Sequence, residues 1–220
     1  SKFRILPKQF GEYDGEKVFE IEQCCVATNS MAFQSYLNCR NYSFIVHLIG
    51  HAVFMPVFKL IKKLNISWYD FSREITNVIQ DEDFQGKFKH VYNEFCVESL
   101  NEMFESEKEA IDFYKEPKNY EAFIKGDIGE NLIGKYTAKG LLYYDDVLTA
   151  IFYVIRKHYN KSDDRQLNII LNSSEKWLRN VYMIDEIFVD KKDESRKNKY
   201  QLNMDFDFHG WLANTDLPFE

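Results

Sequence analysis

A dense apolar stretch, Tyr42–Ile61, is about as long as the span of a lipid bilayer and constrains the fold more than any other segment. Five residues interrupt it, each costly in hydrocarbon: Ser43, His47, His51, Pro56 and Lys59. We therefore predict a buried core helix that begins near Met31, after a cap within Thr28–Ser30. Pro56 should kink or end this helix.

Apolar residues at helical spacing recur through the rest of the chain. Helices are predicted over four further segments: Trp68–Gln80, Phe84–Phe104, Tyr144–Tyr159 and Asp163–Met183. Ser67 is the candidate cap of the first, and Asp145 and Asp146 suit the positive end of the third. We expect a proline-containing break at Lys115–Asn119 and a mixed, glycine-loosened segment at Tyr120–Tyr136.

Strand-like segments lie near both ends of the chain. Lys17–Ala27 alternates over several residues after a predicted turn in Gly11–Gly15, and Glu186–Asp190 and Tyr200–Phe208 also alternate. These strands could pair with one another or complete the sheet of a neighbouring domain. The predicted fold is mainly α, a multi-helix domain with a few short strands contributed by the N-terminal and C-terminal segments.

The sequence divides into three predicted parts. They are a strand-like first segment (1–27), a helical domain (28–185) and a strand-containing C-terminal segment (186–220). The chain starts at Ser1 on strand-like residues and ends at Phe219–Glu220 without a helix cap or charged tail. We therefore expect it to be part of a longer polypeptide.

The formal net charge of −7 disfavours nonspecific nucleic-acid binding, which needs clustered Lys and Arg. Four glutamates recur near helical spacing and are interpreted as a solvated face: Glu94, Glu98, Glu102 and Glu109. They lack the Glu-x-x-His motif of di-iron sites. Phosphate-cradling glycine motifs and the Gly-x-Ser-x-Gly elbow of hydrolases are also absent from the sequence.

The four cysteines include no CxxC pair, and the sequence shows no secretory signal. Cys24 and Cys25 are adjacent, so they are either two thiols on a half-buried strand or a vicinal disulfide or metal pair. Reduced thiols and a cytoplasmic location fit this pattern best.

Two small polar groupings are candidate sites. His47 and His51 are four residues apart on the predicted core helix, so they should share one face. They are either histidines hydrogen-bonded at a core, ligand contacts or, with a third ligand, a metal site. Asp205, Asp207 and His209 alternate on a predicted strand and form either a polar pocket wall or an exposed face.

The run Val26–Phe71 combines several loose motifs. A strand ending in a Thr/Ser-rich turn leads into a Met-containing helix start, aromatic residues, an Arg, an apolar helix, a basic kink and an Asp-Phe pair. The residues at these positions are Thr28, Ser30, Met31, Phe33, Tyr36, Arg40, Phe44, Ile66 and Asp70–Phe71. With the tail Phe206–Glu220, this run resembles the region after the catalytic barrel in cobalamin-binding radical SAM proteins. Gln34–Ser35 replaces the usual acidic residue of that family.

This resemblance implies a larger radical SAM enzyme with a cobalamin domain and a barrel. The parent would use S-adenosylmethionine, cobalamin and a [4Fe–4S] cluster bound through CxxxCxxC. The chain contains neither that motif nor Asp-x-His-x-x-Gly, so we expect no cofactor, metal or catalytic residue in it. It would be an accessory C-terminal domain that packs on the upstream barrel of the same polypeptide and shapes the substrate cavity. Residues 1–27 would form the junction to the barrel. Aromatic residues make up 16% of the chain, and their large apolar side chains suit a domain that keeps water out of the substrate cavity.

The alternative is a free-standing helical binding module for a small apolar ligand or a protein partner. This alternative predicts an internal aromatic-lined pocket, whereas an accessory domain predicts a large exposed apolar patch. If the chain is an accessory domain, polar groups among apolar neighbours are its candidate substrate contacts: Arg40, His47, His51 and Trp211. Arg40 could clamp a carboxylate or phosphate.

Overall fold

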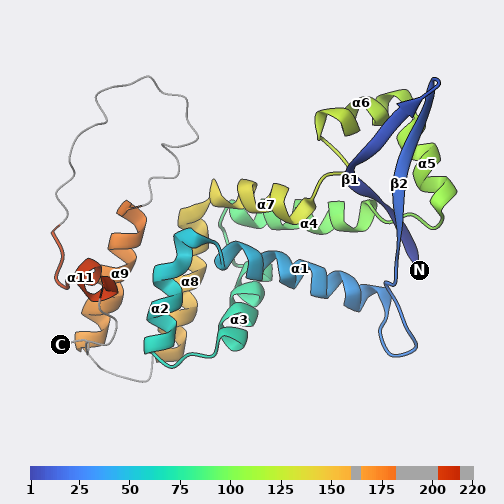
Figure 1. Ribbon diagram of the computed structural model, residues 1–220. Helices are drawn as coiled ribbons and strands as arrows, with labels where there is room; N and C mark the ends of the chain where they lie inside the picture. Colours follow the sequence, from blue (N-terminus) through green and yellow to red (C-terminus); the bar gives the residue numbers. More distant parts are fainter. Residues whose placement is uncertain (160–164, 182–202, 214–220) are drawn as a thin grey trace, which may run out of the picture. The chain divides into compact units, whose positions relative to one another are not determined.

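The computed structural model describes residues 1–159, 165–181 and 203–213 and confirms the mainly α fold (Figure 1). The elements follow one another as β1 (Lys2–Tyr13), β2 (Glu16–Cys24), α1 (Phe33–Ile49), η1 (Ala52–Phe54), α2 (Met55–Lys63), α3 (Trp68–Gln80), α4 (Phe88–Asn101), α5 (Glu107–Lys115), α6 (Pro117–Lys125), α7 (Leu132–Leu141), α8 (Tyr144–Tyr159), α9 (Arg165–Val181) and α11 (Phe208–Ala213). The spans predicted for α3 and α8 are confirmed, and Ser67 caps α3 by accepting from the N–H of Asp70.

The two strands form an antiparallel hairpin. Its turn is confined to Asp14 and Gly15, which both have positive φ, at 50° and 82°. This Asp-Gly pair suits a tight hairpin turn, so β1 extends through the predicted turn region as far as Tyr13. The register shifts between Ile5 and Phe10, around Pro7, which cannot donate to a strand ladder.

The long core helix predicted from Met31 is interrupted earlier than expected. Helix α1 ends at Ile49, and Pro56 lies in the first turn of α2. The expectation that Pro56 would kink or end this helix is therefore wrong. Proline is tolerated in the first turn because its missing N–H has no partner there. Pro117 likewise opens α6, so the break predicted at Lys115–Asn119 shortens to Glu116.

The chain forms two compact units. The first unit comprises Ser1–Phe44 and His90–Ala138, and the second comprises Ile45–Lys89 and Lys139–Glu220. The predicted boundaries near residues 27 and 185 coincide with none of the boundaries between these units. The three-part division stays a prediction.

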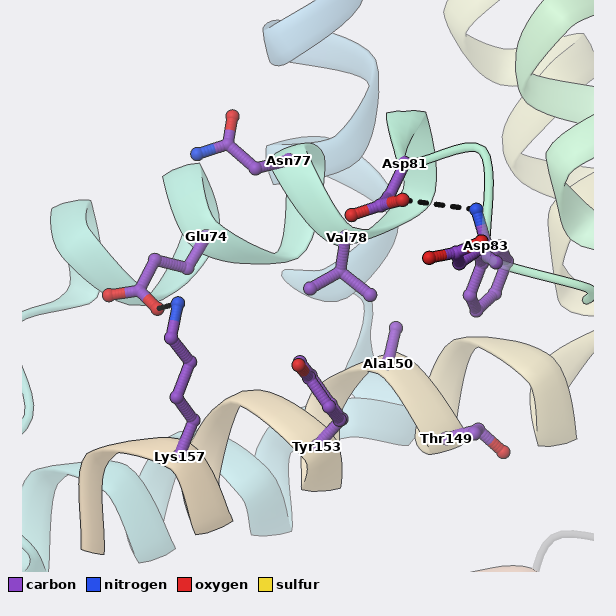
Figure 2. Close-up of a pocket in the computed structure, with 10 residues that line it drawn as sticks. Glu74, Asn77, Val78, Asp81, Asp83, Thr149, Ala150, Tyr153 and Lys157 are labelled. Atoms are coloured by element: carbon purple, nitrogen blue, oxygen red, sulfur yellow. Dashed lines mark hydrogen bonds and ion pairs between the residues drawn. The ribbon is translucent and has the colours of Figure 1, made fainter. Parts of the chain in front are cut away.

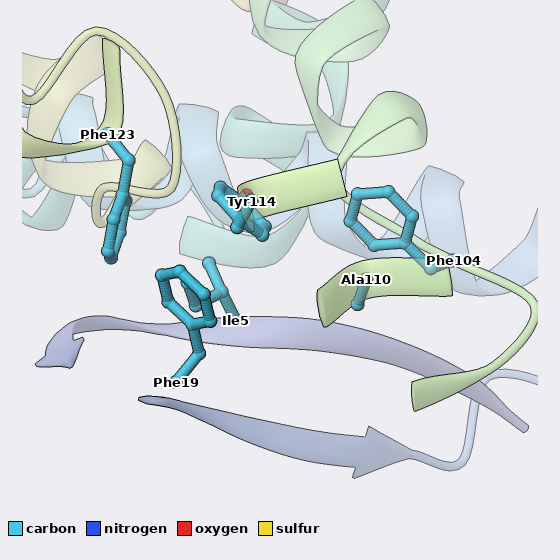
Figure 3. Packing of buried hydrophobic residues seen from close by; sticks show 6 residues of the cluster. All are labelled: Ile5, Phe19, Phe104, Ala110, Tyr114 and Phe123. Atoms are coloured by element: carbon cyan, nitrogen blue, oxygen red, sulfur yellow. The ribbon is translucent and has the colours of Figure 1, made fainter. Parts of the chain in front are cut away.

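In the first unit, α5 packs against both strands and against α6. The core between them is a cluster of six buried residues (Figure 3): Ile5, Phe19, Phe104, Ala110, Tyr114 and Phe123. The backbone of Phe3 exchanges two hydrogen bonds with that of Phe104, at 2.9 and 2.8 Å. These bonds tie β1 to the segment after α4 and hold the Phe104 ring against the aromatic cluster.

In the second unit, α8 packs against both α3 and α9, and α9 packs against α11. Their buried faces are mostly apolar, with Phe71 and Ile75 of α3 and Phe152 and Ile155 of α8 fully buried. Buried hydroxyl groups interrupt two of these faces, on α3 (Ser72, Thr76) and on α9 (Ser173, Ser174). The apolar residues of each helix recur at the spacing of one helical face. This pattern explains why the sequence predicted α3 and α8.

The predicted C-terminal strands differ from the structure where it describes them. Glu186–Asp190 and residues 200–202 lie outside the described residues. Residues 203–207 are not a strand, and α11 begins at Phe208. Asp207 accepts a hydrogen bond from the N–H of Gly210 at 2.9 Å, so an aspartate read as part of a strand caps a helix instead.

Within the described part of the chain, no single helix is long and apolar enough to cross a bilayer. Helix α1 and the helical segment Ala52–Lys63 are bent by 66° relative to each other. Taken together, they have the length and composition of a membrane span, as core helices of soluble proteins also can.

Candidate functional site

A charged cluster lies in the first unit, where β1, α1 and α4 meet. The guanidinium groups of Arg4 and Arg40 both contact Oε1 of Glu102, the former at 3.3 Å. Arg4 also pairs with Glu22 of β2, and Arg40 Nε donates to Ser99 Oγ at 3.3 Å. The Glu102 side chain is only 12% exposed, so two arginines compensate one half-enclosed carboxylate.

A second ion pair lies one helical turn before Glu102, at Glu98 of α4. Lys135 Nζ of α7 donates to both carboxylate oxygens of Glu98, at 2.8 and 3.1 Å, and to the carbonyl of Asp127. The Tyr136 hydroxyl also donates to Glu98. Asn131 Oδ1 accepts from the N–H of Gly134 and caps α7, which fixes the start of this helix. Glu98 and Glu102 are thus held in place by cations from three other elements.

These carboxylates open into a cavity of about 530 Å³. It is lined by Glu98, Asn101, Glu102, Phe104, Phe113, Tyr114, Ile128, Gly129 and Leu132. The three aromatic rings contact one another, with centroids 5.1 to 6.0 Å apart. We call this the first-unit cavity. It combines an apolar aromatic wall with two fixed hydrogen-bond acceptors.

Gly129 allows the chain to close around this cavity. Its φ is +69°, and a Cβ at this position would lie 2.6 Å from the Phe123 ring. Only glycine fits such a backbone conformation against an aromatic ring without strain. The segment that carries Ile128 and Leu132 can therefore lie close to the aromatic cluster.

Burial shifts the pKa of three groups around the cavity. Burial raises the pKa of Glu102, although Arg40 and Arg4 oppose the shift. The pKa of Tyr114 is raised well above its usual value by burial and by the negative charges of Glu102 and Glu98. Burial and the hydrogen bond to Glu98 raise the pKa of Tyr136 in the same way. Both phenols are therefore neutral donors at physiological pH.

The two phenols predict a loss of stability at alkaline pH. Below the pKa of an unfolded tyrosine, about 10, Tyr114 and Tyr136 contribute their full stabilisation. Because their folded pKa values are higher, that contribution falls as the pH rises through this range. Urea denaturation at several pH values above about 9 should show a steeper loss in the wild type than in Tyr114→Phe/Tyr136→Phe. Equal slopes in both proteins would contradict this prediction.

The candidates predicted from the sequence lie in different environments. Arg40 belongs to the charged cluster, where Glu102 and Ser99 hold its guanidinium, so the predicted anion clamp is already occupied by a carboxylate of the chain. Trp211 is buried and stacks on Phe208, with ring centroids 5.5 Å apart. His47 and His51 are exposed, and α1 ends between them, so the prediction that they share one helix face is wrong. A substrate-contact role for these four residues stays a prediction.

Two further interpretations of polar residues need correction. Glu98 and Glu102 do not belong to a solvated face, because both form half-buried ion pairs across the first unit. Asp205, Asp207 and His209 do not share a strand face, since His209 lies in α11. Arg40 was predicted as a possible clamp for a carboxylate or phosphate of a ligand, and the sequence did not identify Glu102 as its partner.

All four cysteines are free, so Cys24 and Cys25 form no vicinal disulfide. Burial raises the pKa of the Cys24 and Cys96 thiols, which disfavours their thiolate forms. Among the residues that the structure describes, no three His, Cys, Asp or Glu side chains are arranged to hold a metal ion. Comparisons with family models, curated proteins and solved structures found no match for this chain.

Proposed function

We propose that this chain is a binding module whose first-unit cavity takes a small apolar, preferably aromatic, molecule carrying a hydrogen-bond donor. The observation that carries the proposal is the pairing of an aromatic wall with two fixed carboxylates in one cavity. Small-molecule sites are typically of this size, mostly apolar, and contain a few placed polar groups.

The apolar part of the cavity sets the shape of the ligand. Phe104 and Tyr114 are buried, while the Phe113 ring is 38% exposed and lies at the accessible side. Phe113 and Tyr114 meet edge to face, with an interplanar angle of 85°. Flat aromatic ligands gain from contact with the faces and edges of such rings.

The polar part of the cavity sets the chemistry of the ligand. An ionised carboxylate only accepts hydrogen bonds. Both arginines contact the same oxygen of Glu102, so its Oε2 can accept from a bound N–H or O–H group. Because Arg4, Arg40 and Lys135 already balance the carboxylates, a neutral donor fits the site better than a second cation.

Indole and 1-methylindole test this proposal, because they share size and shape but only indole has an N–H donor. We expect indole to bind with a Kd below about 1 mM, and 1-methylindole to bind several-fold more weakly. Phe113→Ala should weaken indole binding, whereas Val97→Ala, an exposed position on α4 outside the cavity, should not. Titrations followed by NMR of the full chain would measure these affinities. Equal binding of both ligands, or no effect of Phe113→Ala, would reject the proposal.

A second proposal keeps the accessory-domain function that the resemblance implies. One observation favours it: three large apolar side chains are exposed within the run that carries the resemblance, namely Met55, Phe58 and Tyr69. A barrel of the same polypeptide, carrying the [4Fe–4S] cluster, S-adenosylmethionine and cobalamin, would cover them. The coding DNA upstream of Ser1 tests this proposal. An open frame with CxxxCxxC supports it, and a start codon at or just before the Ser1 codon rejects it.

A further inference from the structure

A groove of about 380 Å³ lies in the second unit between α3 and α8 (Figure 2). Ten residues line it: Glu74, Asn77, Val78, Asp81, Asp83, Phe84, Thr149, Ala150, Tyr153 and Lys157. All of them come from α3, the segment after it, and α8. The groove belongs to a different unit from the first-unit cavity and shares no residue with it.

The middle of the groove is apolar. Val78 of α3 faces Ala150 and Tyr153 of α8, as Figure 2 shows. The Tyr153 side chain is 57% exposed although it lies on a helix whose other face is buried. An exposed aromatic ring beside two aliphatic side chains offers a surface for an apolar stem.

The two ends of the groove differ in charge. At one end, Glu74 pairs with Lys157 and His158, each at 3.1 Å. At the other end, Asp81 and Asp83 lie close together, and Asp81 Oδ1 accepts from the N–H of Asp83 at 3.0 Å. In residues 1–159, 165–181 and 203–213, no cation forms an ion pair with either of these two carboxylates.

A basic side chain approaches this end of the groove without pairing with either carboxylate. Lys89 Nζ donates to the main-chain carbonyl of Asp81 and not to its carboxylate. The lining therefore carries three carboxylates and one ammonium, and Glu74 already holds that ammonium. The field in the groove favours a cation and disfavours an anion.

We infer that this groove binds a small organic cation, an ammonium group on an apolar stem. The ammonium lies between Asp81 and Asp83, and the stem lies over Val78 and Tyr153. Glu74 and Asp81 mark the two ends of the groove and are seven residues apart, which is about 10 Å at the rise of an α-helix. An apolar stem of about six carbons fits within this length. The site is independent of the first-unit cavity.

The probes for this site are n-hexylammonium chloride and 1-hexanol, which share a stem but differ in charge. We expect the full chain to bind the ammonium at least about tenfold more tightly than the alcohol at low ionic strength. The difference should shrink in high salt, because the carboxylates lie at an open rim. Isothermal titration calorimetry would measure both ligands.

A charge-removing variant locates the site. Asp81→Asn/Asp83→Asn keeps the Oδ1 acceptor and the side-chain size, so the fold should persist, while binding of the ammonium should fall about tenfold or more. The control is Glu82→Gln, which removes the neighbouring exposed carboxylate outside the groove. Equal losses in variant and control, or no loss in the variant, would overturn the inference. Tyr153→Ala should weaken both probes, and Phe113→Ala should affect neither, which separates this site from the first-unit cavity.

Discussion

Replacing Glu102 with alanine should lower the free energy of unfolding by about 3 kcal/mol or more. The substitution removes the carboxylate that pairs with Arg40, whose side chain is 12% exposed. Arg40 would keep its hydrogen bond to Ser99 but lose its counter-charge in a half-enclosed environment. A guanidinium cannot lose its proton to escape this cost. Urea denaturation at neutral pH would measure the change.

Two further variants separate charge from packing in this prediction. Glu102→Gln keeps an oxygen acceptor for the arginines, and burial already raises the pKa of Glu102, so this variant should cost clearly less than the alanine. Glu105→Ala removes an exposed carboxylate that pairs with Lys2, and should cost less than about 1 kcal/mol. If Glu102→Ala and Glu105→Ala destabilise equally, the charged cluster is no more than a surface ion pair.

The charged cluster also shows where sequence reasoning stops. Glu94, Glu98, Glu102 and Glu109 recur near helical spacing, and spacing alone cannot separate Glu98 and Glu102, which form ion pairs across the first unit, from the other two. The difference comes from Arg4 and Arg40, which are far from Glu102 in the chain and meet it only after the strands and α1 pack around α4. Long-range pairing of this kind leaves no periodic signal.

Local signals, in contrast, predicted much of the helical fold. Ser67 and the apolar stripe of α3 predicted that helix, and Asp145 and Asp146 marked the start of α8. Pro56 and Pro117 were predicted to break helices, but each lies in the first turn of one. A proline is excluded from a helix interior and tolerated in a first turn. It therefore marks a helix boundary without indicating whether the helix precedes or follows it. The alternation at Asp205–His209 was too short to distinguish a strand from a capped helical turn.

The alternation in β2 predicted a strand, and the buried face of this strand leads to the second large effect. Phe19→Ala should lower the free energy of unfolding by about 3 kcal/mol. The Phe19 ring is 8% exposed and lies 6.0 Å from the ring centroids of Tyr114, Tyr120 and Phe123. A two-stranded hairpin is marginal in water, so it depends on this contact with α5 and α6.

Val18→Ala is the matched control for this prediction, because Val18 is the next residue on the same strand but points to the opposite face. Its side chain is 48% exposed, so its truncation should cost less than about 1 kcal/mol. The pairing of Phe10 with Phe19 and of Gly11 with Val18 fixes this assignment. A one-residue slip of the register would exchange the two faces and reverse the order of the two variants. Thermal or urea denaturation of both variants therefore tests the register of the hairpin as well as the strength of its aromatic core.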